Sequence, residues 1–223
     1  LTLEDPGPGR YDRFGPACTA CGNDRPVGTR RDWLLGGTPE HIQRPGVAYL
    51  FDGTSGALKT TFHDPTPLGT TGVETNGFGS TMATFGANVL IANDHATGGT
   101  NRAGEVHLFE PNGNWLRTFS NPTPAYGDDF GAEVTVDGNN VFIGADFDDA
   151  VATDAGAAYM FNGTNGALLR TFLNPSPEAG QHFGREIAVA GDIVLISSQF
   201  DNAAAPKSAA VSSFTISSVP FLT

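Results

Sequence analysis

The chain has 223 residues, including 29 Gly and 15 Pro, and its 12 Lys and Arg are outnumbered by 24 Asp and Glu, which gives a net charge of −12 at pH 7. This length is enough to bury one sizeable core. The negative field repels phosphates and argues against nucleic acid as a partner. No apolar run reaches the roughly twenty residues of a membrane-spanning helix, so we expect no membrane insertion.

A Phe-Gly pair recurs along the chain, and each recurrence opens a similar run of residues. The pairs are Phe14-Gly15, Phe78-Gly79, Phe130-Gly131 and Phe183-Gly184, and successive pairs are 64, 52 and 53 residues apart. Repeats of this length are typical of propeller blades and similar arrays. We therefore predict a repeat protein built from four-stranded units, with each of these phenylalanines buried between neighbouring units.

The third copy shows the predicted unit most clearly. Alternating residues at 132–136 and an apolar run at 141–145, joined by the turn Asp137-Gly138-Asn139, indicate a β-hairpin. Residues 156–161 and 167–172 indicate the third and fourth strands. The connector that follows is Asn174-Pro175-Ser176-Pro177. It ends the unit because proline has no backbone N–H to donate a hydrogen bond to a neighbouring strand. No copy shows helical periodicity of useful length.

The copies align in phase, and they share both a third-strand phenylalanine and a Pro-x-Pro connector. These units resemble FG-GAP repeats, the blades of integrin-α-like β-propellers. The resemblance implies an all-β propeller of about four four-stranded antiparallel blades, in a single domain over 1–223. The repeats are expected at 9–67, 68–124, 125–177 and 178–223. The calcium loop of the family, Asp-x-Asp-x-Asp-Gly, is absent from every copy, so we expect no cofactor, calcium included.

When the copies are aligned on their connectors, residues 1–8 occupy the positions of a fourth strand followed by a degenerate connector. Leu1, Thr2 and Leu3 fill the strand positions without the rest of a blade, whereas the last copy has three clear strands that end at Phe214. An open blade edge is a template for strand addition, so we expect Leu1 to Leu3 to pair with the last blade. If the tail after Phe214 is not a fourth strand, this pairing closes the ring within one molecule. If Val219 to Leu222 supplies the fourth strand, Leu1 to Leu3 can be donated to a neighbouring molecule. Head-to-tail donation that does not close gives a filament.

Cys18 and Cys21 form a Cys-x-x-Cys pair. By phase, Cys18 falls at a core-facing strand position and Cys21 where the strand turns. Residues three apart in a strand are about 10 Å apart, which is too far for a disulfide unless the chain bends locally. No second pair completes a tetrahedral metal site. We expect core packing in preference to a disulfide or a metal.

The loops after the second strand of each copy lie on the same face as the connectors, and this long-loop face is the predicted binding face. Asp32, Asp148 and Asp201 share one phase there. An acidic ring would suit a cation or a basic partner, but Asp also caps its own backbone in turns. Another candidate is the apolar tripeptide Trp33-Leu34-Leu35, which is either an exposed anchor or a plug over the adjoining blade.

No catalytic constellation is visible, because the five histidines are scattered over different phases and no nucleophile motif is present. His107 replaces Tyr49 and Tyr159 in the third strand, so we expect it on the blade surface. Asn162-Gly163-Thr164 is a glycosylation sequon on a predicted turn; the same residues also suit an ordinary hairpin turn.

Low lysine content, abundant Thr, Ser, Asn and Gly, and the family resemblance favour an exported protein, extracellular or at the cell surface. A chain that starts at Leu1 is expected of a processed or trimmed product. We predict a structural or adhesive module without enzymatic activity, which associates with itself or with another extracellular protein or glycan. The alternatives are a glycan- or cation-dependent binding module and a polysaccharide hydrolase or lyase. Loss of binding on chelation would favour the first alternative, and turnover of polysaccharide the second.

Overall fold

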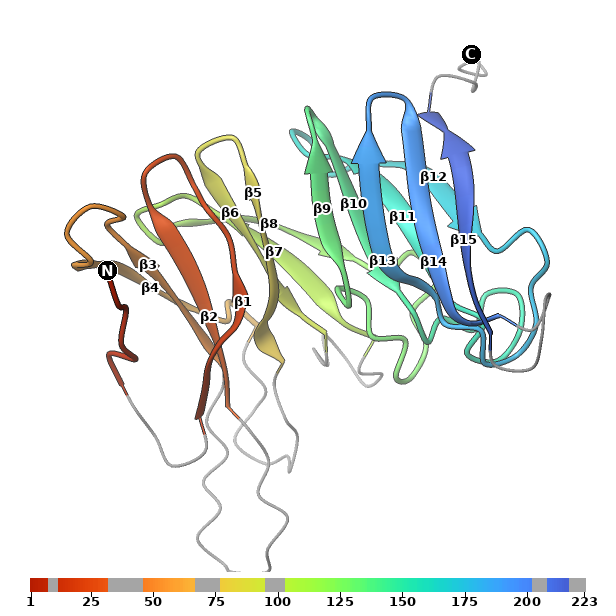
Figure 1. Ribbon diagram of the computed structural model, residues 1–223, viewed down its shortest axis with the longest axis horizontal. Helices are drawn as coiled ribbons and strands as arrows, with labels where there is room; N and C mark the ends of the chain where they lie inside the picture. Colours follow the sequence, from red (N-terminus) through yellow and green to blue (C-terminus); the bar gives the residue numbers. More distant parts are fainter. Residues whose placement is uncertain (8–11, 32–45, 67–76, 95–102, 202–207, 217–223) are drawn as a thin grey trace, which may run out of the picture. The chain divides into compact units, whose positions relative to one another are not determined.

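The computed structural model describes residues 1–7, 12–31, 46–66, 77–94, 103–201 and 208–216. Throughout these ranges the chain forms β-strands and no α-helix. The strands are arranged in four antiparallel sheets, here called blades 1 to 4, and each sheet follows the order of the chain (Figure 1). None of the described segments is a helix long and apolar enough to cross a membrane.

Each of the first three blades has four strands. Blade 1 contains β1 (Asp12–Cys18), β2 (Arg25–Arg31), β3 (Val47–Phe51) and β4 (Leu58–His63). Blade 2 contains β5 (Phe78–Phe85), β6 (Asn88–Asn93), β7 (Glu105–Phe109) and β8 (Trp115–Ser120). Blade 3 contains β9 (Val134–Asp137), β10 (Asn140–Ala145), β11 (Ala157–Asn162) and β12 (Leu168–Leu173).

Blade 4 contains β13 (Phe183–Ala190), β14 (Ile193–Asp201) and β15 (Ser208–Thr215). Three strands of blade 4 are described, and among the described residues β15 pairs with β14 alone. Residues 217–223, which include the candidate fourth strand at 219–222, lie outside the described residues. The predicted all-β, propeller-like fold of four blades is confirmed. The chain divides into two compact units, Leu1–Gly131 with blades 1 and 2, and Ala132–Thr223 with blades 3 and 4.

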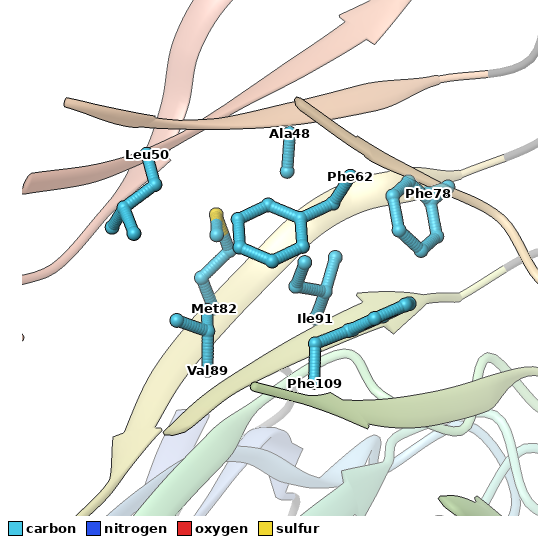
Figure 2. Close-up of a cluster of buried hydrophobic side chains, with 8 residues drawn as sticks. All are labelled: Ala48, Leu50, Phe62, Phe78, Met82, Val89, Ile91 and Phe109. Carbon is cyan, nitrogen blue, oxygen red and sulfur yellow. The ribbon is translucent and has the colours of Figure 1, made fainter. Parts of the chain in front are cut away.

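In the first unit, the two blades pack face to face through one apolar cluster. Blade 1 contributes Ala48, Leu50 and Phe62, and we call the side of a blade that carries these positions its trailing face. Blade 2 contributes Phe78, Met82, Val89, Ile91 and Phe109 from its opposite side, the leading face. Figure 2 shows Phe62 of β4 lying among the side chains of the leading face of blade 2.

The second unit uses the same positions. Phe142, Ala158, Met160 and Phe172 on the trailing face of blade 3 form a cluster with Phe183, Ile187, Val194 and Ile196 on the leading face of blade 4. The rings of Phe172 and Phe214 are 5.2 Å apart, and those of the equivalent Phe62 and Phe109 are 5.4 Å apart. The repeat in sequence is therefore a repeat of one packing interface.

The Phe-Gly pairs mark the point where the first strand of a blade deviates from regular pairing. Phe78, Phe130 and Phe183 are fully buried as predicted, but Phe14 is only half-buried. The glycine after each phenylalanine has a positive φ, and in Gly184 it is 99°. A Cβ on Gly184 would also overlap the carbonyl oxygen of Ala157 in blade 3. Only glycine satisfies both the backbone conformation and this close approach.

Each connector begins with an Asx turn. The side-chain oxygen Oδ1 of Asp64 accepts a hydrogen bond from the Thr66 amide at 2.8 Å. The same bond forms between Asn121 and Thr123 at 2.9 Å and between Asn174 and Ser176 at 3.0 Å. This turn holds the chain as it leaves the fourth strand, and so it is a structural signature of a completed blade.

Candidate interaction site

The acidic loop of blade 3 is folded around its own carboxylates. Asp148 is fully buried; its Oδ2 accepts a hydrogen bond from the Tyr159 hydroxyl at 2.6 Å and its Oδ1 one from the Ala150 amide at 2.8 Å. The Asp149 carboxylate accepts a bond from the amide of Asp154 at 2.8 Å. In this loop the carboxylates therefore stabilise turns, which is the second of the two roles that the sequence allows.

The other members of the predicted acidic ring and the predicted apolar anchor are not seen. Asp32, Trp33, Leu34 and Leu35 lie outside the described residues, and of Asp201 only the backbone, at the end of β14, is described. Their roles remain predictions.

Two carboxylates between blades 3 and 4 have shifted pKa values. Burial raises the pKa of Asp146, and this effect is opposed by Arg185, whose Nη1 lies 2.9 Å from the Asp146 carboxylate. Burial, assisted by the negative charge of Glu186, raises the pKa of Glu133 to about 7. Sequence reasoning did not single out Glu133, although it and Glu186 both lie three residues after a repeat phenylalanine.

The predicted core packing is wrong for Cys18 but is confirmed for Cys21. Cys18 is exposed and Cys21 is buried, and both are free thiols. Cys18 does have the phase of Met82 and Ile187, which are buried, but among the described residues of the first unit no sheet lies in front of the leading face of blade 1. Cys21 is buried because its Sγ lies 3.1 Å from the carbonyl oxygen of Ala87, in the first hairpin turn of blade 2.

The expectation that His107 lies on the blade surface is also wrong. The ring is fully buried, and its Nδ1 is 2.9 Å from the Thr118 hydroxyl. Its Nε2 is 3.7 Å from carboxylate oxygens of both Asp64 and Glu105, a grouping that spacing along the chain did not indicate. Burial lowers the pKa of His107 to about 4, so the ring is neutral at pH 7.

Asn162 begins the turn between β11 and β12. Its Oδ1 accepts hydrogen bonds from the amides of Thr164 and Asn165, at 2.9 and 3.0 Å. Asp52 accepts the equivalent bonds in blade 1, where no sequon is present. The geometry of Asn162 is thus that of a hairpin turn, and its glycosylation remains a prediction.

Blade 4 has an exposed apolar trailing face. Ile193, Leu195 and Val211 are 49%, 41% and 64% exposed. Val211 occupies the same blade position as Ala48 and Ala158, which are buried against the next blade of their units at 0% and 1% exposure. The second unit therefore ends in a blade face whose counterparts are interfaces elsewhere in the chain.

Blade 1 has the complementary feature, a leading face that is only partly covered. Val27, Val47, Tyr49 and Phe51 form a buried cluster there, with the half-buried Phe14 and Leu3 packed against it. Cys18, on the same face, is exposed. Among the described residues of each unit, no further blade packs on the trailing face of blade 4 or on the leading face of blade 1.

The strand pairing, the Phe-Gly irregularity and the connector turn recur together from blade to blade, and a comparison with known families explains why. Residues 124–161 match the family model of the FG-GAP repeat. This segment is an FG-GAP repeat. The match runs from the end of one connector through Phe130-Gly131 to the end of the third strand of blade 3. A search of curated proteins found no match.

The recognised FG-GAP repeat supports a general role in recognition. FG-GAP repeats mediate interactions with proteins or other ligands and are typical of extracellular or surface proteins. Here the repeat supplies one blade of a scaffold, and a scaffold does not by itself fix a function. The partner must therefore be inferred from the surfaces of this chain.

We expect a chelator to leave the stability of this protein almost unchanged, because no copy contains the FG-GAP calcium loop. Within the part of the chain that the structure describes, no group of three or more His, Cys, Asp and Glu side chains is placed to hold a metal ion. Thermal unfolding with and without a chelator checks this. A melting temperature that falls by several degrees and recovers with calcium would show a structural ion.

Proposed function

We propose that this protein is a non-enzymatic extracellular module, structural or adhesive, which associates with further copies of itself through its terminal blades. The observation that carries this proposal is the exposed trailing face of blade 4. Its residues have the positions that form the blade interfaces inside both compact units. An apolar face whose counterparts on blades 1 and 3 are interfaces is best explained by association.

The chemistry of the two open faces fits head-to-tail association. The trailing face of blade 4 in one copy contacts the leading face of blade 1 in the next, so each contact joins two different surfaces. A pair of copies therefore keeps one uncovered trailing face at one end and one uncovered leading face at the other. Contacts of this type form rings when the rotation closes and filaments when it does not. Such assemblies suit a structural or adhesive role outside the cell.

Val211→Lys is expected to abolish self-association, since it places a charge in the centre of the exposed trailing face, where the equivalent residues of other blades are buried. Light scattering over a range of protein concentrations measures the effect. Leu169→Lys is the matched control, because Leu169 is 43% exposed on β12, away from this face.

The proposal predicts concentration-dependent association of the unaltered chain and of Leu169→Lys, but not of Val211→Lys. An unaltered chain that stays monomeric at every concentration would contradict it, and so would equal association of all three proteins.

Binding of a glycan or a cation-dependent ligand through the long-loop face is the alternative function. It depends on Asp32 and on the tripeptide 33–35, which lie outside the described residues. The described carboxylate of that predicted ring, Asp148, is hydrogen-bonded within its own loop. This observation favours association through the terminal blades over ligand binding by an acidic ring.

A further inference from the structure

Three residues near the connector between blades 1 and 2 depart from the repeat. This connector begins with Asp64, whereas the later connectors begin with Asn121 and Asn174. On β7, His107 stands where blades 1 and 3 have tyrosine, and Glu105 stands where the other blades have valine or alanine. Each departure introduces a side chain that gains a proton in acid.

The fold brings these three side chains together in one buried cluster. Nε2 of His107 lies 3.7 Å from Oδ1 of Asp64 and 3.7 Å from Oε2 of Glu105. The Thr66 hydroxyl lies between the two carboxylates, 3.1 Å from that of Asp64 and 3.0 Å from that of Glu105. The side chains of His107 and Asp64 are almost completely buried. The departures from the repeat therefore meet at one joint, inside the first compact unit.

This cluster includes a hydrogen bond that ties blade 1 to blade 2. Oδ2 of Asp64, in the connector, accepts a bond of 2.8 Å from the side-chain amide of Asn93 on β6. Asn93 lies opposite the repeat phenylalanine of blade 2, as Ser198 does in blade 4. The side-chain amide of Asn174 contacts Ser198 at 3.1 Å in the equivalent tie between blades 3 and 4. The tie is thus a repeated feature, and a carboxylate takes part in it at the first joint.

The His107 ring fits the cluster in its neutral form. Nε2 has no hydrogen-bond partner among the described residues, and Nδ1 lies 2.9 Å from the Thr118 hydroxyl. Because Nε2 faces two carboxylates, the single proton of the neutral ring belongs there, and Thr118 donates to Nδ1. Within the described part of the chain, Asp64 and Glu105 are the charged groups that face the ring.

The other strands of blade 2 contribute neutral groups around the ring. These are Phe78 of β5, Ile91 of β6 and Thr118 of β8. A second proton on the ring would therefore place a charge in an apolar site, 3.7 Å from its counter-ions and beyond hydrogen-bond distance. A buried charge without a hydrogen-bonded partner is costly.

We propose that the cluster of His107, Asp64 and Glu105 is an acid-sensitive switch, which keeps blades 1 and 2 in contact while the ring is neutral and opens that contact when the ring is protonated. The proposal concerns the first unit alone and does not depend on self-association. It goes beyond the proposed function by giving the joint a response to pH.

The direction of the response follows from the burial of the ring. Burial lowers the pKa of His107 from 6.5 to about 4 in the closed joint. The stabilisation that the neutral ring provides is therefore complete above pH 6.5 and is lost as the pH falls to 4. Across this range the ratio of closed to open molecules falls by up to about 300-fold on account of His107. Burial raises the pKa of Glu105, which acts in the opposite direction, so the test compares variants at His107.

Cys21 reports the opening of this contact. Its thiol is buried, and its Sγ lies 3.1 Å from the carbonyl oxygen of Ala87 in blade 2. Cys18→Ser removes the other cysteine of the chain. In this background, the reaction of Cys21 with dithiodipyridine, which labels thiols in acid as well as at neutral pH, is followed from pH 7 to pH 4. The rate for the urea-unfolded chain, divided by the rate for the folded chain at the same pH, gives the protection of Cys21.

Two variants remove the titrating ring. His107→Gln keeps a neutral hydrogen-bonding side chain, and His107→Tyr restores the residue of blades 1 and 3 and provides a second variant if the first does not fold. His63→Gln is the matched control, because His63 is exposed and directly precedes Asp64 in the chain.

The proposal predicts that the protection of Cys21 falls between pH 7 and pH 4 by up to about 300-fold more in the parent than in either His107 variant. His63→Gln should behave as the parent does. His107 variants that lower the protection equally at every pH would show that the ring only fills space, and would overturn the proposal. A pH dependence that disappears equally in His63→Gln would overturn it too.

Discussion

Phe183→Ala is expected to lower the free energy of unfolding by about 3–5 kcal/mol, the usual cost of truncating a fully buried phenylalanine. Phe183 is fully buried, and its ring lies 6.0 Å from that of Phe214, within the cluster that joins blades 3 and 4. Phe130→Ala is expected to cost a similar amount, because Phe130 is equally buried.

Phe14→Ala is the matched control for this prediction. Phe14 is the equivalent residue of the first repeat, but it is only half-buried on the open leading face of blade 1. Its truncation in dilute protein should therefore cost clearly less than that of Phe183. Urea unfolding followed by circular dichroism measures both, and equal losses for the two variants would contradict the assignment of open and covered faces.

Gly184→Ala is expected to destabilise the protein by at least about 3 kcal/mol, since backbone strain and overpacking act together. Gly184 has a φ of 99°, and an added Cβ would meet the carbonyl oxygen of Ala157 in the neighbouring blade. The carbonyl belongs to a paired strand and cannot move aside without disturbing the sheet.

Gly138→Ala separates the two causes. Gly138 also has a positive φ, of 57°, but no atom lies within 4 Å of its Cβ position. It should therefore cost only the strain of a left-handed residue, about 1–2 kcal/mol. The same urea titration compares the variants, and a loss in Gly184→Ala no larger than in Gly138→Ala would show that the blades are less closely packed than described.

The strands were predictable because each blade repeats one pattern of faces. Phase alone placed β10 and β11 within one residue, and it put the third-strand phenylalanines of the four copies at one position. Phe51, Phe109 and Phe161 are buried there, and Phe214 is half-buried. It also identified Leu1–Leu3 as a fragment of a fourth strand, and the packing of Leu3 and the Asx turn at Asp5 support that interpretation. Periodicity captures what every copy shares.

Features that depend on a particular neighbour were not predictable from phase. Cys18 has a core phase, but within the described part of its unit no sheet lies in front of it, whereas Cys21 sits at a turn and is buried by the hairpin turn of blade 2. His107 occupies a position taken by tyrosine in two other blades, and this replacement alone suggested a place on the blade surface. His107 is in fact buried, and its ring packs against the Phe78 and Phe109 rings of its own blade.

Solution mass of the purified chain across a wide concentration range, combined with electron microscopy, tests the central claim most directly. The claim is that the open trailing face of blade 4 and the open leading face of blade 1 join in successive copies. It predicts a mass that rises with concentration, and rings or filaments of repeated units in the images. A single-chain mass at every concentration, with isolated particles of one size, would contradict it.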